Sequence, residues 1–151
     1  MYRRTLIALL PAAFFSRPAF GESFEVSHSD EEWRALLTER QFRVLRLADT
    51  EGPNTSPLTY ERRKGTFACA GCELPLFSSD TKFESHTGWP SFWQPLSNAV
   101  ATQSDFGIMG NRTEVHCRRC GGHLGHVFKD GPPPTGLRYC MNGAALKFTE
   151  A

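Results

Sequence analysis

The sequence has 151 residues, and a chain of this length buries one sizeable hydrophobic core but rarely two. Its 40% hydrophobic and 22% charged residues exclude a disordered, collagen-like or purely coiled-coil chain, and a net charge of +1 argues against a basic nucleic-acid-binding protein. Thirteen glycines, ten prolines and twelve phenylalanines favour short strands and turns over a helical bundle.

Residues 1–21 have the pattern of a cleaved export signal. Arg3 and Arg4 form a positive head, an apolar run follows, and small residues precede a cut that we expect near Gly21. The paired arginines resemble a twin-arginine signal, and the apolar run is too short to span a membrane. An organelle presequence or an uncleaved N-terminus that tethers the chain to a membrane is the alternative.

Removal of this segment changes the charge of the remaining domain, residues 22–151. The segment holds three of the 17 Lys and Arg residues and no acidic residue, which leaves 14 basic against 16 acidic residues. Such a mildly acidic domain is poorly suited to nucleic acid. We therefore expect a protein exported to the periplasm, with no stable membrane insertion once the signal is removed.

Two short helices are predicted at the start of the domain. Ser29 with Glu32 forms a capping box, and Thr38 with Gln41 repeats it before a second helix that runs to about Leu47. The apolar face of the first helix is expected to consist of Trp33, Leu36 and Leu37. The segment 52–57, rich in Gly, Pro and Asn, then indicates a loop.

The remainder of the chain is β-rich and punctuated by Gly and Pro turns. The predicted strands are 66–68, 99–106, 113–117, 137–142 and 146–149. An antiparallel sheet or a partly closed barrel with a helical N-terminal flank fits this order, which is a mainly β member of the α+β class.

Two Cys-x-x-Cys pairs indicate a metal site. Cys69 and Cys72 form the first pair, Cys117 and Cys120 the second, and 44 residues separate the pairs. Two tight turns of this kind can converge on one tetrahedral thiolate site, for which zinc is the predicted ion. Four thiolates leave no open position, so the zinc would hold the fold rather than react. Gly71 and Gly121 are expected to give these turns their backbone freedom.

Other interpretations of the same cysteines stay open at this point. Two disulfides, redox-active pairs and a rubredoxin-like iron site would also use four paired cysteines, and export makes the disulfides more credible. One of the nearby histidines, His123 or His126, is an alternative ligand for one of the sulfurs.

The fifth cysteine, Cys140, is either an inert core residue or a nucleophile. In a strand over 137–142, Arg138, Cys140 and Asn142 project from one face. The guanidinium would favour the thiolate, which is the form that attacks, and the amide would orient a substrate.

Two further motifs bear on that choice. In the segment 123–126, a bulge or turn at Gly125 would bring His123 and His126 into one pocket, where an imidazole can donate a proton. In the segment 88–93, Trp89 lies in an aromatic, Pro-containing loop that could wall a pocket for a thioether-like methyl group or anchor a surface loop in the core.

Taken together, these motifs closely resemble those of the B-type methionine sulfoxide reductases over residues 29–149. The shared motifs are Cys-Ala-Gly-Cys, Thr-Gly-Trp-Pro-Ser-Phe, Cys-x-x-Cys-x-x-His-Leu-Gly-His-Val-Phe, Asp-Gly-Pro-x-Pro-Thr-Gly and Arg-Tyr-Cys-x-Asn. The resemblance implies two antiparallel β-sheets in a barrel-like domain with short N-terminal helices and one structural zinc. It also implies reduction of the R epimer of methionine sulfoxide in oxidised proteins, by thioredoxin or another thiol reductant, in a monomeric protein of oxidative stress repair.

The resemblance assigns roles to individual residues. Cys140 matches the nucleophile, which becomes a sulfenic acid during the reaction. Trp89 matches the aromatic residue that binds the methyl group, and Phe128 joins it in substrate binding. The other residues implied to act beside the thiol are His123, His126, Arg138 and Asn142. Cys69, Cys72, Cys117 and Cys120 match the zinc ligands.

One position departs from the family pattern. Many relatives carry a resolving cysteine where this chain has Thr87, and the sequence offers no sixth thiol. We therefore expect an external thiol to attack the sulfenic acid directly, because the use of a metal-binding cysteine would cost the metal site.

Two other function classes remain as alternatives. A zinc-containing β-domain that only binds a ligand would use Cys140 and the histidines for packing, and replacement of Cys140 by serine would leave it unaffected. A disulfide oxidoreductase would use one Cys-x-x-Cys pair, which tightly bound zinc would prevent.

Overall fold

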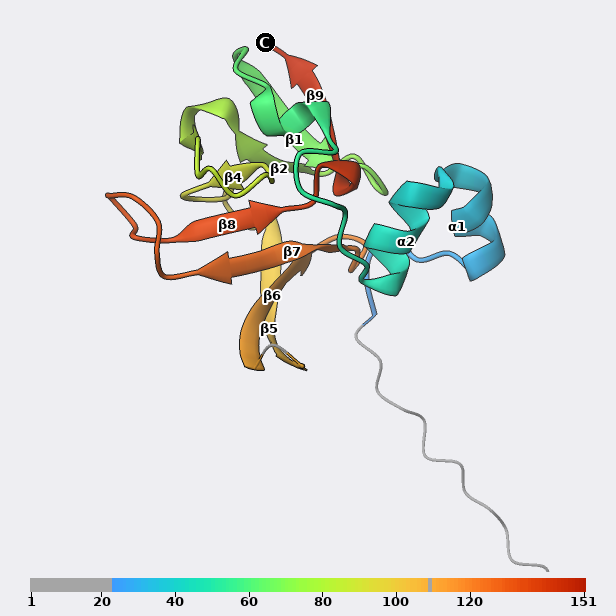
Figure 1. Cartoon of the computed structure of the whole chain (residues 1–151). Helices are drawn as coiled ribbons and strands as arrows, with labels where there is room; N and C mark the ends of the chain where they lie inside the picture. The colour runs from blue at the N-terminus through green and yellow to red at the C-terminus, as the bar shows by residue number, and fades with distance from the viewer. Residues whose placement is uncertain (1–22, 109) are drawn as a thin grey trace, which may run out of the picture.

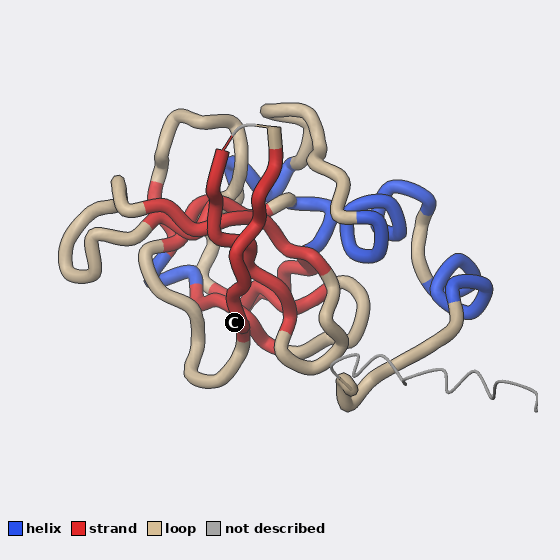
Figure 2. The backbone as a smooth tube through the Cα atoms, turned by 90° about the horizontal axis from the view of Figure 1, so that it is seen from below, coloured by secondary structure: helices blue, strands red, loops and turns tan. Residues whose placement is uncertain are grey.

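The structure is a computed structural model that describes residues 23–108 and 110–151. The predicted signal segment, residues 1–21, lies outside the described residues. Two short helices stand beside a larger group of strands (Figures 1 and 2). Within the described part of the chain, no helix combines the length and the apolar character that crossing a membrane requires.

Both predicted helices are present, and both begin at the predicted caps. Helix α1 spans Asp30–Leu36 and helix α2 spans Glu39–Leu47, and each is preceded by a complete capping box. The predicted apolar face of α1 is wrong in one residue: Leu36 is 62% exposed, whereas Trp33 and Leu37 are buried. The reason is that this two-turn helix buries only the face that carries Trp33, and Leu36 lies outside that face.

The strands form two antiparallel sheets. The three-stranded sheet has the order β2-β1-β9, and the six-stranded sheet has the order β3-β4-β8-β7-β6-β5. The first contains β1 (Gly65–Cys69), β2 (Pro75–Ser78) and β9 (Leu146–Glu150). The second contains β3 (Lys82–Phe83), β4 (Ser91–Phe92), β5 (Val100–Gly107), β6 (Gly110–Cys117), β7 (His123–Phe128) and β8 (Arg138–Met141). The predicted class is confirmed, and within the described residues neither sheet closes on itself.

Each of the five predicted strands is found, and four further strands were not predicted. The aromatic segment expected as a loop contains β4, which pairs with β3 and β8. Two-residue strands such as β3 and β4 are too short to show an alternating pattern. Strand β7 is buried over its first four residues, so it lacks the alternation of a half-exposed strand as well.

Phenylalanine side chains join the two sheets. Phe92 of the larger sheet stacks on Phe77 with ring centroids 4.3 Å apart and meets Phe67 edge-on at 5.0 Å. Phe67 and Phe77 belong to β1 and β2 of the smaller sheet, and all three rings are fully buried. Burial of each ring stabilises the fold by about 1.5–3 kcal/mol, so this contact fixes one sheet against the other.

The described N-terminal residues cover the turn that holds the second cysteine pair. Val26 N–H donates to the Arg119 carbonyl over 3.0 Å, and the Glu25 carboxylate accepts from Arg118 Nη1 over 2.6 Å. The Phe24 ring lies against Gly121, where a Cβ atom would come within 2.3 Å of it. Glycine is therefore required at this contact, which its positive φ of 69° independently favours.

Candidate active site and metal centre

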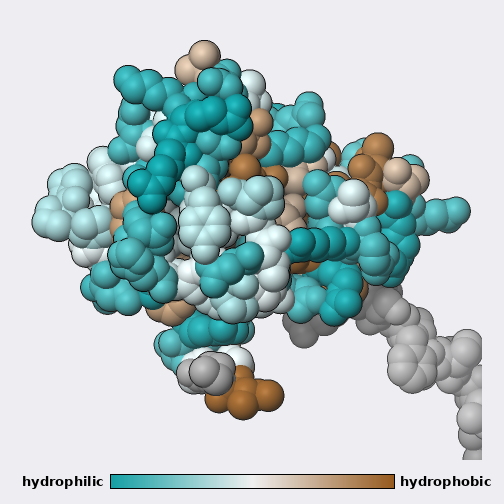
Figure 3. All heavy atoms as spheres, turned by 45° about the horizontal axis from the view of Figure 1, so that its top comes forward, coloured by the Kyte–Doolittle hydropathy of each residue, from teal (hydrophilic) through white to brown (hydrophobic). Residues whose placement is uncertain are grey.

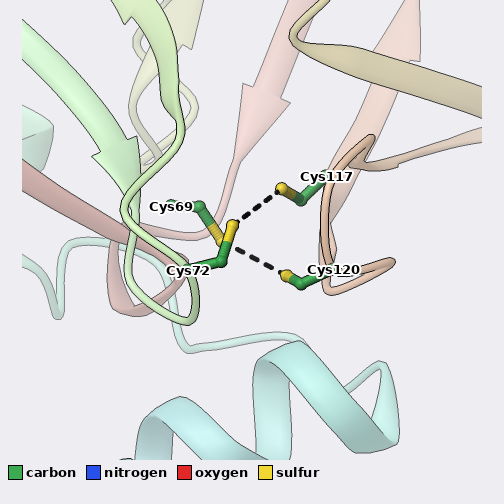
Figure 4. Close-up of side chains that lie close together, drawn as sticks. All are labelled: Cys69, Cys72, Cys117 and Cys120. Carbon is green, nitrogen blue, oxygen red and sulfur yellow. Dashed lines mark hydrogen bonds between the residues drawn. The ribbon is translucent and has the colours of Figure 1, made fainter. Parts of the chain in front are cut away.

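Four cysteine sulfurs converge between the two sheets. Cys69 and Cys72 come from the end of β1 and the turn after it, and Cys117 and Cys120 come from the end of β6 and its following turn (Figure 4). All four Sγ atoms lie within 4.8 Å of one another, with Cys69 3.7 Å from Cys120 and Cys72 3.5 Å from Cys117. None of these cysteines is in a disulfide.

This donor set fits a tetrahedral metal ion. Zinc–thiolate bonds of about 2.3 Å place the sulfurs of a tetrahedron about 3.8 Å apart, close to the two contacts across the pairs. The two sulfurs of a disulfide lie about 2.05 Å apart, and all four cysteines are free, so neither Cys-x-x-Cys pair forms a disulfide. The two predicted pairs therefore form a single cluster, and no pair is free to act as a separate redox centre.

The two metal-binding turns have the same backbone form. In each turn the residue after the second cysteine donates its N–H to the carbonyl of the first: Glu73 to Cys69 and Gly121 to Cys117, both over 2.8 Å. Glu73 has φ 64° and Gly121 has φ 69°. The expectation for Gly121 holds, whereas the left-handed position of the first turn is Glu73 and not Gly71.

The pairing of β7 with β8 places the fifth cysteine beside a histidine. His126 is opposite Cys140 and Phe128 is opposite Arg138, so these four side chains share one face of the sheet. On the other edge of β8, Cys140 is opposite Ser91 of β4. Cys140 thus sits on a central strand, half-buried, with neighbours fixed on both sides.

A small hollow of about 140 Å³ opens over Cys140. Its lining brings together five residues singled out in the sequence: Trp89, His126, Phe128, Cys140 and Asn142. Thr50, Arg112 and Gly125 complete the lining. We call this space the thiol hollow. A larger hollow of about 490 Å³ beside α2 has neither a cysteine nor a histidine in its lining, so it offers no comparable chemistry.

The expected bulge in β7 is present, one residue from the predicted position. The register passes from Val115 opposite Gly125 to His116 opposite His123, so Leu124 is the extra residue. This brings the His123 and His126 rings within 5.4 Å of each other. His126 lines the thiol hollow and an adjacent hollow, and His123 lines the adjacent one. The two imidazoles therefore share that second pocket, as predicted, and only His126 also lines the hollow over Cys140.

Two carboxylates that the sequence reasoning missed hold these imidazoles. His126 Nε2 lies 2.7 Å from Asp105 Oδ2, and His123 Nδ1 lies 2.6 Å from Glu114 Oε1. The hydrogen bond from His126 lowers the pKa of Asp105. Burial would raise the pKa of Glu114, but hydrogen bonds, chiefly from His123, outweigh it and the net direction is downward. Both carboxylates are therefore ionised acceptors, and the facing ring nitrogens carry the protons.

His123 is a neutral imidazole at neutral pH, because burial lowers its pKa more than Glu114 raises it. With its proton on Nδ1, its Nε2 is a bare acceptor, and this atom is buried with no partner in the described chain. His123 thus has no proton to give from the nitrogen that is free.

Arg138 lies beside Cys140 but is mainly engaged by another residue. Its guanidinium donates to both oxygens of Asp130, over 2.9 and 3.0 Å, and stacks over the Phe128 ring at 4.4 Å. Burial raises the pKa of Cys140, while Arg138 and the Thr87 hydroxyl act to lower it. The predicted direction of the Arg138 effect is correct, but burial outweighs it, so the resting group is a thiol.

This balance predicts the pH dependence of Cys140 reactivity. Alkylation by iodoacetamide requires the thiolate, so its rate should rise with pH around a midpoint above that of an exposed cysteine. Arg138→Gln should move the midpoint further up, because a charge that favours the thiolate is lost. Mass spectrometry of the Cys140 peptide measures the rate. Arg63→Gln, at an exposed arginine bound to Glu61, is the matched control; a midpoint that falls or stays in Arg138→Gln would contradict the account.

Glu51 is a further residue that no sequence pattern marked. Its carboxylate is buried and accepts from the N–H groups of Gly143 and Ala144, which follow β8, over 2.5 and 3.0 Å. Its own N–H donates to Asn142 Oδ1 over 3.0 Å, and its carbonyl accepts from Trp89 Nε1 over 3.1 Å. The Glu51 segment therefore fixes two walls of the thiol hollow. A lone acid in a loop gives no sequence signal for such a role.

Asn142 lies beside Cys140 as expected, and both polar atoms of its amide are engaged by the protein itself. Its Oδ1 accepts from Glu51 and its Nδ2 donates to the Leu124 carbonyl over 3.0 Å. The amide thus ties the loop before the hollow to the bulge in β7, although the residue still lines the hollow.

The matching family model and the curated relatives agree on one family. The SelR domain model matches residues 37–150. The chain is 54% identical over 127 residues to a "Peptide methionine sulfoxide reductase MsrB" of Leptospira interrogans, covering 83% of this chain and 97% of that protein. Proteins of the same name from Methanosarcina barkeri and Agrobacterium fabrum are 53% identical over 124 residues and 50% over 127. Each match covers 82% of this chain, and 87% and 93% of those proteins.

Proposed function

The chain belongs to the SelR domain family of B-type peptide methionine sulfoxide reductases, and from this we propose that Cys140 is its nucleophile. The enzyme reduces the R epimer of methionine sulfoxide in polypeptides to methionine, with a thiol as reductant. The observation that carries the proposal is the thiol hollow, where Cys140 lies with His126, Trp89 and Phe128. A binding module would have no need for a thiol and an imidazole in one hollow.

The proposed reaction transfers oxygen from the substrate to Cys140. Sγ of Cys140, as the thiolate, bonds to the sulfoxide sulfur, and the S–O oxygen takes a proton. The oxygen then moves to Sγ: its bond to the substrate sulfur and the bond between the two sulfurs break, an O–Sγ bond forms, and one electron pair stays on the substrate sulfur as it becomes a thioether. The oxygen ends on Cys140 as a sulfenic acid, so Cys140 is oxidised by two electrons and the substrate sulfur is reduced by two. The methyl group of the substrate would contact Trp89 and Phe128, whose rings provide apolar walls.

We assign the proton donation to His126. It is opposite Cys140 in the sheet and lines the same hollow, and Asp105 fixes its ring through Nε2. Because Nε2 keeps its proton toward Asp105, Nδ1 donates to the sulfoxide oxygen only from the doubly protonated imidazolium, which is the form that the proposal requires. His123, whose free nitrogen is an acceptor in the adjacent hollow, would instead keep His126 and the hollow in position.

Zinc is the metal that we propose for the four-cysteine cluster. A closed set of four thiolates in tetrahedral array is the donor set of structural zinc sites, and Cys69, Cys72, Cys117 and Cys120 would hold one ion per chain. When bound, the ion supplies folding free energy and takes no part in the oxygen transfer.

Recycling is proposed to occur by direct attack of an external thiol on the oxidised Cys140. Thr87 occupies the position of a resolving cysteine, and the four other thiols form the metal cluster. Two donor thiols become one disulfide, one water leaves, and Cys140 returns to the thiol. We propose a monomer as the working form.

We also propose that the enzyme repairs oxidised proteins outside the cytoplasm. The support for export is the sequence pattern of residues 1–21. An extracytoplasmic reductase requires its own supply of reducing thiols, because that compartment keeps thiols oxidised.

Separated epimers test the proposed activity. With dithiothreitol as reductant, the protein should reduce the R-sulfoxide of a blocked methionine at least about a hundredfold faster than the S-sulfoxide, because the wrong epimer exchanges the methyl and oxygen positions. Chromatographic separation of methionine from the two sulfoxides gives both rates. Turnover of the S epimer alone would overturn the proposal.

A further inference from the structure

A second hollow is continuous with the thiol hollow. It measures about 390 Å³ and shares Thr50, Arg112 and His126 with the thiol hollow as common walls. The remaining lining residues are Ala48, Gln103, Ser104, Asp105, Phe106, Glu114 and His123. We call it the hairpin hollow, because most of its wall belongs to the β5–β6 hairpin. A chain whose sulfoxide occupied the thiol hollow would meet this surface next.

The hairpin ends in exposed apolar side chains. Strands β5 and β6 pair along their full length and extend away from the rest of the domain (Figure 1). Phe106 is 81% exposed and Ile108 is fully exposed. Figure 3 shows a hydrophobic group of atoms at the end of this projection, next to hydrophilic surface. Phe106 both lines the hairpin hollow and stands at this tip, so its ring joins the apolar tip to a hollow whose other walls are mostly polar.

We propose that the hairpin tip and hairpin hollow bind the substrate polypeptide on one side of the oxidised methionine and favour an apolar side chain there. The inference rests on the proposed function, because it takes the thiol hollow as the sulfoxide site. It adds a preference for the residues that flank the sulfoxide, which the chemistry at Cys140 does not provide.

Arg112 supports an extended polypeptide as the occupant. Its guanidinium lies between the two hollows, with Nη2 donating to Asp105 over 2.9 Å. Its Nε is buried and has no partner among the described residues. The side chain as a whole is 33% exposed, so the accessible part of the guanidinium can donate to a main-chain carbonyl of a bound polypeptide.

The charges of the hairpin hollow argue against an anionic membrane as the occupant. Arg112 is paired with Asp105, and the pKa of Glu114 is lowered, so the ionised side chains that line the hollow carry no excess of positive charge. Anionic lipid surfaces are recognised by clusters of unpaired basic residues.

Matched peptides test the proposal. Two blocked hexapeptides, each with one methionine (R)-sulfoxide, carry either leucines or serines on both sides of it. The wild-type enzyme should reduce the leucine peptide with about tenfold higher kcat/KM, an effect of the size expected for one buried apolar contact. The Phe106→Ser/Ile108→Ser variant should lose this preference, while its turnover of blocked methionine (R)-sulfoxide stays unchanged.

The matched control is Leu36→Ser/Leu47→Ser, which removes two exposed apolar side chains from the helices. It should keep the peptide preference. Equal kcat/KM for the two peptides in wild type, or an equal loss on all substrates in the hairpin variant, would overturn the proposal. The proposal would also be overturned if the variant kept the peptide preference and changed another property instead. A change in vesicle binding would assign the tip to a membrane, a change in oligomeric state to a second copy, and a change in the rate of thiol recycling to the reductant. Failure of wild type to reduce the blocked amino acid would instead refute the proposed function.

Discussion

Replacement of Cys140 by serine is expected to remove sulfoxide reductase activity, by about four orders of magnitude, because no other group in the thiol hollow can accept the oxygen. The four remaining cysteines belong to the metal cluster, so none can replace the lost nucleophile. Serine is close in volume to cysteine, and Cys140 is outside the buried core. Metal content and the midpoint of thermal unfolding should therefore match those of wild type.

Product analysis of separated R-sulfoxide with dithiothreitol measures the loss. In parallel, a sulfenic acid reagent added to wild type with substrate but without reductant should label Cys140, and mass spectrometry identifies the labelled peptide. Equal rates for mutant and wild type, or a label found only at another cysteine, would refute the role of this residue. Ser91→Ala, at the position opposite Cys140, serves as a neighbouring control that keeps the thiol.

Loss of the metal is expected to unfold the domain. Structural zinc contributes about 10 kcal/mol or more to folding in small domains, which is comparable to the whole stability of a typical domain of about 5–15 kcal/mol. The Cys117→Ser variant removes one ligand from the buried end of β6, where the second metal-binding turn begins. We expect it to lose the ion and its cooperative thermal transition.

Metal analysis and circular dichroism on heating test this expectation. Cys140→Ser is the matched control, since it removes a thiol without touching the cluster, and it should retain one zinc per chain. Retention of a full equivalent of metal together with a wild-type unfolding midpoint in Cys117→Ser would show that the cluster does not support the fold. Iron in place of zinc would be found in the same measurement.

The features that could be predicted from the sequence depend on short-range rules. The helix starts at Ser29 and Thr38 follow from capping boxes within four residues, and the two metal-binding turns follow from a fixed cysteine spacing. The strand that carries Cys140 is predicted from a short β-rich segment between Gly and Pro turns, and the alternation of a strand then places Arg138 and Cys140 on one face.

The features that were missed depend on contacts between distant segments. Glu51 lies about ninety positions in the sequence before the N–H groups that it binds. Asp105 of β5 contacts His126 of β7 only because both strands pair with β6, one on each side of it. The register shift that makes Leu124 the extra residue arises from the pairing of β6 with β7, so the sequence of β7 alone could not locate it.

Phe24, at the beginning of the folded domain, packs on Gly121 and so helps to shield the second metal-binding turn from solvent. An aminopeptidase that removed residues through Phe24 would uncover the turn that carries Cys117 and Cys120 and would also break the Glu25 ion pair in its next step. Competing chelators would then reach the sulfurs more readily. The durability of the metal-binding turn thus depends in part on a single aromatic ring that precedes the first helix.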